Sequence, residues 1–134
     1  MTERAPHVHT ITENVPGMAT AGTDDTIILG RAPFAGTVGG VWYAADAAIT
    51  GAATNHRRVA VINRGQAGVG ATIVAELAFD NGINAVAGDE MAITLSGTAA
   101  NLVLVEGDVL AWFSDAVGTG LADPGGLVRV VVNR

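Results

Sequence analysis

The sequence predicts an all-β fold: an eight-stranded antiparallel, jelly-roll-like β-sandwich with an extended N-terminal arm. Three observations support this class. Short runs of β-branched, aliphatic and aromatic residues recur along the chain, and residues typical of turns separate them. No segment makes a convincing helix. Eight antiparallel strands without helices indicate two sheets packed face to face, and eight is the strand number of a jelly roll.

The clearest strand pattern lies in the last third of the chain, residues 102–134. Val128, Val130 and Val132 share one face of a strand at 127–133, and Arg129 lies on the other face, which is typical of a half-buried strand. The preceding Asp123-Pro-Gly-Gly126 has Pro and Gly where a reverse turn requires them. Two further strands are predicted here, at residues 102–105 and 108–114.

Five more strands are predicted upstream, at residues 26–29, 37–43, 57–63, 71–79 and 90–95. The pair Gly39-Gly40 inside one of them suggests a bulge or a close backbone approach. Residues 44–55 are rich in alanine, but Thr50, Gly51 and Thr54 favour a loop over a helix.

If these eight strands form a jelly roll, the second and seventh are neighbours in one sheet, and the first and eighth pair in the other. Residues 37–43 would then lie beside 108–114, and residues 26–29 beside 127–133. Trp42 would consequently lie on a strand adjacent to that of Trp112.

The chain divides into an extended N-terminal arm, residues 1–24, and a β-sandwich body, residues 25–134. A strand from His7 to Glu13 is conceivable, but Asn14-Val-Pro-Gly17 interrupts it, and the residues that follow have no periodicity. We expect the arm to be ordered only where it lies on another surface.

Composition indicates one domain with a thin core. Of 134 residues, 49% are hydrophobic but only 4% are aromatic. A mean hydropathy of +0.40 is high for a monomer, so we expect a homo-oligomer that hides apolar surface between subunits. No run reaches the roughly 18 apolar residues of a membrane helix, so no membrane partner is expected. We see no secretory signal and no Cys for disulfides or thiolate metal sites.

Charge argues against a nucleic-acid partner. The formal net charge is −6, and all seven basic residues are Arg, scattered along the chain. Affinity for nucleic acids depends on neutralising phosphates, which clustered cations do best. Arg57 and Arg58 form the one basic pair, and we expect both to be solvated on the surface.

The sequence lacks the patterns of a catalytic centre, so we expect neither enzymatic activity nor a cofactor. Ser96 and Ser114 are the only serines, and neither lies in a nucleophile elbow. The chain has no Cys nucleophile and no Lys for a Schiff base. The glycines of residues 65–70 lack the Lys and the helix that complete a phosphate loop.

One segment has the spacing of a metal motif. His7-x-His9-x-x-x-Glu13 matches the first metal motif of cupins, which are jelly rolls, and residues two apart on a strand share a face. The flanking glycines and the second motif's His are missing, so we expect no metal. The acidic pairs Asp24-Asp25 and Asp89-Glu90 are too sparse for a calcium site.

The aromatic residues Trp42, Tyr43 and Trp112 lie in apolar strands, and we expect them to pack in the core or at a subunit interface. Exposed together on a β surface, the two Trp side chains would instead form a platform for sugar rings.

Several parts of the sequence resemble small head proteins of tailed bacteriophages of high-GC hosts, which are capsid decoration or stabilising proteins with a compact β body. The resemblance covers about residues 30–134. It is carried by Phe34-Ala-Gly-Thr-Val-Gly-Gly-Val-Trp-Tyr43, Ala47-Ala-Ile-Thr-Gly-Ala-Ala-Thr-Asn55, residues 58–63, Gly107-Asp-Val-Leu-Ala-Trp112 and Gly118-Thr-Gly-Leu-Ala-Asp-Pro-Gly-Gly126.

The resemblance implies a structural virion protein, made in the host cytoplasm, that binds the major capsid protein on the outer capsid surface as a homotrimer. Net negative charge suits that position better than a surface that lines packaged DNA. Val8, Ile11 and Val15 would dock the arm on a neighbouring sheet. Two other classes stay open: a carbohydrate- or receptor-binding jelly-roll module of a phage fibre, and a small cupin-like metal protein.

Overall fold

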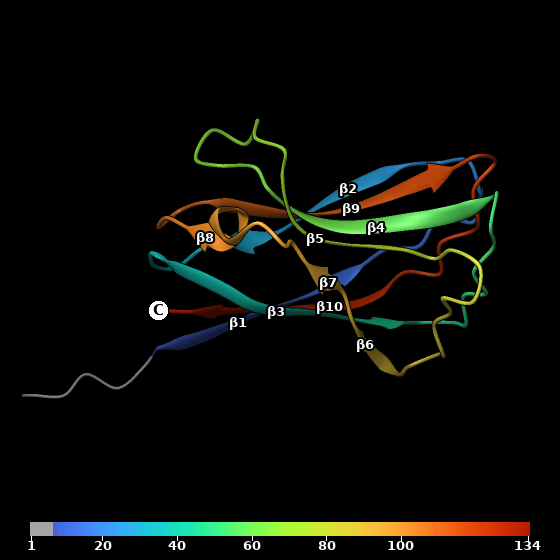
Figure 1. Cartoon of the computed structure of the whole chain (residues 1–134), viewed down its shortest axis with the longest axis horizontal. Helices are drawn as coiled ribbons and strands as arrows, with labels where there is room; N and C mark the ends of the chain where they lie inside the picture. The colour runs from blue at the N-terminus through green and yellow to red at the C-terminus, as the bar shows by residue number, and fades with distance from the viewer. Residues whose placement is uncertain (1–6) are drawn as a thin grey trace, which may run out of the picture.

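The computed structural model describes residues 7–134, which form two β-sheets stacked face to face (Figure 1). The strands are β1 Val8–Val15, β2 Asp25–Arg31, β3 Gly36–Ala45, β4 His56–Asn63, β5 Thr72–Ala78, β6 Glu90–Ala92, β7 Thr94–Leu95, β8 Val103–Leu104, β9 Val109–Val117 and β10 Gly126–Asn133. A single turn of 3-10 helix, η1 (Ala99–Leu102), precedes β8. The described residues contain no α-helix, and no helix among them could cross a membrane.

The two sheets have the strand order of a jelly roll. The β1 sheet runs β1-β10-β3-β6, with β8 also paired to β3, and the β2 sheet runs β2-β9-β4-β5-β7. If the short strands β6, β7 and β8 are counted as one interrupted sixth position, the order of positions is 1-8-3-6 in one sheet and 2-7-4-5 in the other, where β7 adds a short piece of the sixth position beside β5. The prediction of an all-β, jelly-roll-like sandwich is therefore confirmed.

The particular strand pairs predicted from the sequence are wrong by one position. β3 pairs with β10 and not with β9, and β2 pairs with β9 and not with β10. Trp42 and Trp112 consequently lie in different sheets. The pairing rule itself holds once β1 is counted as the first strand, because β2 and β9 are then second and seventh, and β1 and β10 are first and eighth.

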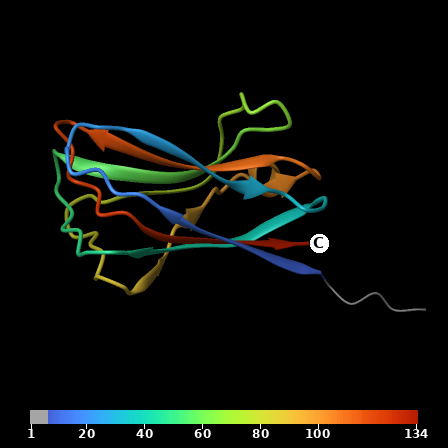
Figure 2. The same ribbon diagram turned by 180° about the vertical axis from the view of Figure 1, so that it is seen from behind.

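The segment 8–15, expected in the arm, forms an edge strand of the body. β1 pairs with β10 along its whole length, from Val8 opposite Asn133 to Val15 opposite Gly126. Seen from behind, it follows the margin of its sheet (Figure 2). Residues 1–6 of the expected arm lie outside the described residues. From residue 8 onward, the chain therefore belongs to the sandwich.

Strand alternation builds the core between the sheets. Val128, Val130 and Val132 of β10 are fully buried, as their spacing predicts. Tyr43 from the β1 sheet meets Trp112 from the β2 sheet with ring centroids 5.0 Å apart, a separation at which aromatic pairs are favourable.

The loop predicted at residues 44–55 begins at residue 46, because residues 44 and 45 still belong to β3. It is an irregular connection, and an isolated bridge between Ile49 and Ala85 ties it to the β5–β6 connection. The long connections β1–β2, β3–β4, β5–β6 and β9–β10 gather at one end of the sandwich, whereas the β4–β5 loop extends away from its sheet near the other end (Figures 1 and 2).

Candidate functional site

The described residues, 7–134, enclose no pocket, and they contain no group of three or more His, Asp or Glu side chains placed to share a metal ion. The features that remain to be considered are polar networks at the two ends of the sandwich and the faces and edges of its sheets.

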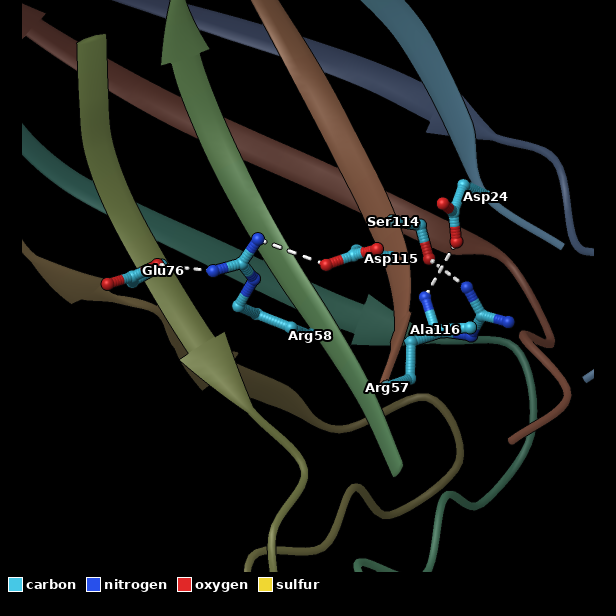
Figure 3. A network of polar contacts seen from close by, with 7 residues as sticks. All are labelled: Asp24, Arg57, Arg58, Glu76, Ser114, Asp115 and Ala116. Atoms are coloured by element: carbon cyan, nitrogen blue, oxygen red, sulfur yellow. Dashed lines mark hydrogen bonds and ion pairs between the residues drawn. The ribbon is translucent and has the colours of Figure 1, made fainter. Parts of the chain in front are cut away.

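A buried polar network closes the end at which β4 begins (Figure 3). Arg57 is fully buried, and its Nε donates to Leu121 O at 2.8 Å. Its Nη2 donates to Ala21 O at 2.8 Å and its Nη1 to Ser114 Oγ at 3.1 Å. The Ser114 hydroxyl in turn donates to Asp123 Oδ2 at 2.6 Å. The expectation that Arg57 is solvated is wrong.

Strand alternation separates the two arginines of the predicted surface pair. Arg57 shares the inner face of β4 with Val59 and Val61, whereas Arg58 points outward. There it lies between Asp115 at 3.0 Å and Glu76 at 3.7 Å, with its side chain 39% exposed (Figure 3). Only the second arginine occupies the kind of position expected for the pair.

The Arg57 network holds strands and loops together, and its serine is not arranged for nucleophilic catalysis. A catalytic serine requires a base that takes its proton, most often a histidine. The hydroxyl of Ser114 instead donates to Asp123 and accepts from the Arg57 cation, and both Ser114 and Asp123 are buried. The network joins β4 and β9 to the β1–β2 and β9–β10 connections.

Tyr43 reinforces the same end from the β1 sheet. Its hydroxyl donates to Gly125 O at 2.9 Å. Burial raises the pKa of Tyr43 above its usual range, and the carboxylates of Asp123 and Asp46 raise it further against an opposing effect of Arg57. Tyr43 therefore remains a neutral hydrogen-bond donor.

A second network lies at the opposite end, centred on the buried Asp108. Its Oδ1 accepts from Gln66 Nε2 at 2.7 Å, and its Oδ2 accepts from Asn63 Nδ2 at 3.0 Å and from Val105 N at 2.9 Å. Burial acts to raise the pKa of Asp108, but these three hydrogen bonds outweigh it and lower the pKa below its usual range. Asp108 thereby anchors the β8–β9 turn to the β4–β5 loop.

Of the three aromatic residues singled out in the sequence, only Trp42 reaches a solvent face. Tyr43 and Trp112 are buried in the protein's own core. Arg129 lies over the Trp42 indole, with Cζ 4.1 Å from the ring centroid, and it binds Glu90 through hydrogen bonds of 3.0 and 2.7 Å. A guanidinium over the indole leaves that ring face closed to a sugar, so the two Trp side chains form no stacking platform.

Glycine makes room for this arrangement. The Trp42 ring lies over Gly40, where the Cβ of any other residue would overlap the indole. Opposite Val131 and Val132 the β3–β10 register shifts, which leaves Gly39 as a bulge. The predicted bulge or close approach at this glycine pair is confirmed.

The outer face of the β1 sheet carries no net charge. We call it the neutral face, and its outward-pointing residues, taken from the register and the strand alternation, are Val8, Thr10, Thr12, Asn14, Thr37, Trp42, Ala44, Glu90, Ala92, Val103, Leu127, Arg129, Val131 and Asn133. The only charged members, Arg129 and Glu90, bind each other. An acidic protein thus presents one broad face on which charge is balanced.

The residues of the cupin-like spacing do not converge. The His7 ring lies against Phe34 with centroids 6.1 Å apart, and its Nδ1 is 3.2 Å from Arg134 Nη1. His9 and Glu13 are exposed on β1. They lie four residues apart on an extended strand, a span of about 13 Å that is too long for one shared ion.

The predicted acidic pairs take part in local bonds. Asp24 accepts from Ala116 N at 2.8 Å (Figure 3), and Asp25 accepts from Thr26 N at 2.9 Å. Asp89 is exposed, next to the Glu90 that binds Arg129.

The three predicted docking residues of the arm separate in the structure. Ile11 and Val15 are buried in the protein's own core, whereas Val8 is 62% exposed on the neutral face. Only Val8 therefore offers its side chain to a partner.

These features define an all-β, jelly-roll-like protein whose buried polar groups brace the sandwich. No family model matches the sequence, and no curated protein matches it. Among solved structures, the fold is similar to a chain in the structure of infectious bursal disease virus Gx strain, with 19% sequence identity and a TM-score of 0.43. The match covers 96% of this protein but only 32% of that chain, and a similarity this distant carries no argument about function.

Proposed function

We propose that the protein is a structural component of a virion: a capsid decoration or stabilising protein that binds the outer surface of a phage head as a small homo-oligomer. The resemblance of residues 30–134 to small phage head proteins supports this role. The jelly-roll strand order agrees with it, because viral capsid domains use this architecture, as do lectins and cupins.

The observation that carries the proposal is the neutral face. In a chain of net charge −6, a broad sheet surface of Thr, Val, Asn, Leu and Trp residues carries one cation and one anion that neutralise each other. Such a face can rest on a capsid protein without leaving an unpaired charge buried, which would be costly. The exposed carboxylates of the loops at one end of the sandwich, Asp46, Asp80 and Asp89, then stay in water.

The buried polar groups support a role without catalysis. Arg57, Ser114, Asp123 and Asp108 are all engaged in hydrogen bonds that hold loops and strands together. The carbohydrate-binding alternative has less support, because Arg129 covers a face of Trp42. In this proposal the protein contacts the capsid through its neutral face and not through a free N-terminal arm.

The experiment has two stages. First, the protein should co-purify with assembled virus particles in a constant copy number per head. Second, heads that lack the protein should bind the purified wild-type chain and sediment with it. Leu127→Glu combined with Val131→Glu places two uncompensated charges on the neutral face, and we expect this variant to lose binding while its fold is retained.

Ile28→Glu is the control for added charge at another surface. Ile28 is 56% exposed on the outer face of the β2 sheet, so the change adds one negative charge, against two in the double variant, on the opposite side of the molecule. Loss of binding in the control with retention in the double variant would assign the contact to the other sheet. Absence of the protein from purified particles would overturn the virion role itself.

A further inference from the structure

We propose that two copies of this chain join through the free edge of β1, antiparallel and about a two-fold axis at Ile11, so that their β1 sheets become one continuous sheet. The inference does not rest on the capsid role, because it concerns only the contact of the chain with itself.

The direction of the backbone N–H and C=O groups shows which residues of β1 can bond to a further strand. Arg134 N donates to His7 O at 2.9 Å, so residue 7 points its backbone groups toward β10. In an antiparallel pair this direction alternates from residue to residue. The backbone N–H and C=O of Val8, Thr10, Thr12 and Asn14 therefore point away from β10, and no other strand of residues 7–134 pairs with β1.

One register uses all four of these residues. Centring the pair on Ile11 sets Val8 opposite Asn14 and Thr10 opposite Thr12, each as a hydrogen-bonded pair, and the two-fold axis repeats both pairs. Strand addition of this kind gains most of its affinity from such main-chain hydrogen bonds. A long edge left unpaired in water is the surface from which sheets associate.

Side chains favour the same register. His9 then lies directly opposite Glu13 of the second copy, in the non-hydrogen-bonded positions where side chains approach most closely. Both residues are exposed on β1, so a cross-strand pair between them displaces no existing contact in the described structure. Thr10 opposite Thr12 is also a favourable cross-strand pair.

The neighbouring registers are poorer. Centring on Thr12 pairs Val8 with Pro16, which has no N–H to donate, and sets Glu13 opposite Ile11. Centring on Thr10 leaves Asn14 without a described partner and sets His9 opposite Ile11. Among these, only the register about Ile11 satisfies the whole edge and also sets His9 opposite Glu13.

A β1-to-β1 contact has two-fold symmetry, so it produces a dimer and not the trimer that the phage resemblance implies. The expected mass in solution is twice the 13.5 kDa of one chain.

Proline substitutions test the edge. The N–H of Thr12 points away from β10, so Thr12→Pro removes an edge donor while it leaves every β1–β10 hydrogen bond in place. We expect light scattering to show a dimer for the wild type and for Thr12→Val, and a monomer for Thr12→Pro with an unchanged far-UV CD spectrum. A wild type that stays monomeric up to about 1 mM, or that forms a trimer, would overturn the proposal.

Cysteine pairs test the register independently of proline. The chain has no Cys of its own. We expect Thr10→Cys and Thr12→Cys to form no disulfide separately and to form a heterodisulfide when the two proteins are mixed under mild oxidation. A disulfide from Thr10→Cys alone would move the axis to residue 10, and one from Thr12→Cys alone would move it to residue 12; either result contradicts the register. If none of the three oxidation experiments gives a disulfide, the edge contact is refuted.

A charge exchange completes the test. His9→Glu or Glu13→Arg alone should raise the dimer dissociation constant several-fold, and the double variant should restore it. A double variant no tighter than the weaker single variant would contradict the His9–Glu13 pair. Binding to virus heads serves as a separate readout, so failure of the dimer and failure of the capsid role can be distinguished.

Discussion

Arg57→Met is the substitution with the largest expected effect on stability. Methionine fills much of the same space, but it leaves three acceptors without their donors: the buried Ser114 Oγ and the partly buried Leu121 O and Ala21 O. It also leaves the buried Asp123 carboxylate without the cation of its network. Breaking a buried ionic network by removing one partner costs about 3–5 kcal/mol, which is a large part of the roughly 5–15 kcal/mol that stabilises a typical domain.

Arg58→Met is the matched control, because it removes the same side chain from the next position of the same strand. Arg58 is 39% exposed, and its ion pairs with Asp115 and Glu76 lie at the surface. Exposed pairs of this kind contribute about 0–1 kcal/mol. The two arginines therefore differ in burial more than in chemistry.

Urea denaturation, monitored by tryptophan fluorescence, measures the free energy of unfolding of both variants. Trp112 reports the transition because it is buried in the core and becomes exposed on unfolding. With a typical slope of about 1–3 kcal/mol per molar urea, a loss of about 4 kcal/mol lowers the midpoint by roughly 1–4 M. Equal midpoints for Arg57→Met and Arg58→Met would refute the assignment of Arg57 as the buried brace.

The hydrogen bonds that lower the pKa of Asp108 stabilise the fold above about pH 4, and this contribution is lost as the pH falls through the folded-state pKa. Asp108→Asn should therefore lower the urea midpoint at pH 7 and flatten its decrease in acid; an unchanged acid profile would contradict this. Tyr43 is the only tyrosine, and its raised pKa means that phenolate absorbance in alkali should appear above pH 10 and together with unfolding, with stability lost as the pH rises past that point. Phenolate formation near pH 10 in the folded protein would argue against its burial. Gly40→Val should displace the Trp42 indole, change the near-UV CD spectrum and cost about 1–3 kcal/mol, and an unchanged spectrum would show that the ring does not lie over residue 40.

Most strand positions could be predicted from the sequence, because alternation and turn chemistry are local. β1 could not, and its position explains why. As an edge strand it buries only Ile11 and Val15, which are four residues apart, while His9 and Glu13 between and beside them stay exposed. Because two of its four inward positions are polar, β1 lacks the apolar period of two that identifies its neighbours, and leaving it out shifted every predicted pair by one position.

The polar features of the site also differ in how far a local sequence pattern predicts them. Arg57 alternates along β4 with Val59 and Val61, and this local pattern indicates a buried position. Its charge indicates an exposed position, because Arg is rarely buried, and the prediction followed the charge. The contact of Trp42 with Arg129 and Glu90 joins three segments far apart in the chain. No local pattern specifies it, although Gly40 marked the place where a neighbour approaches the backbone.

The position of β10 has a consequence for the time course of folding. β10 lies between β1 and β3, so the first of these strands has no partner in its own sheet until residues 126–133 have been synthesised. Pairing over such a separation in sequence is slow, and unpaired strand edges are prone to aggregate while they wait. The nascent chain can assemble the β2 sheet earlier, through β4 and β5, but its β1 sheet closes only as synthesis nears residue 134. Changes that weaken β10 should therefore lower the yield of folded protein more than the equilibrium stability of the molecules that do fold.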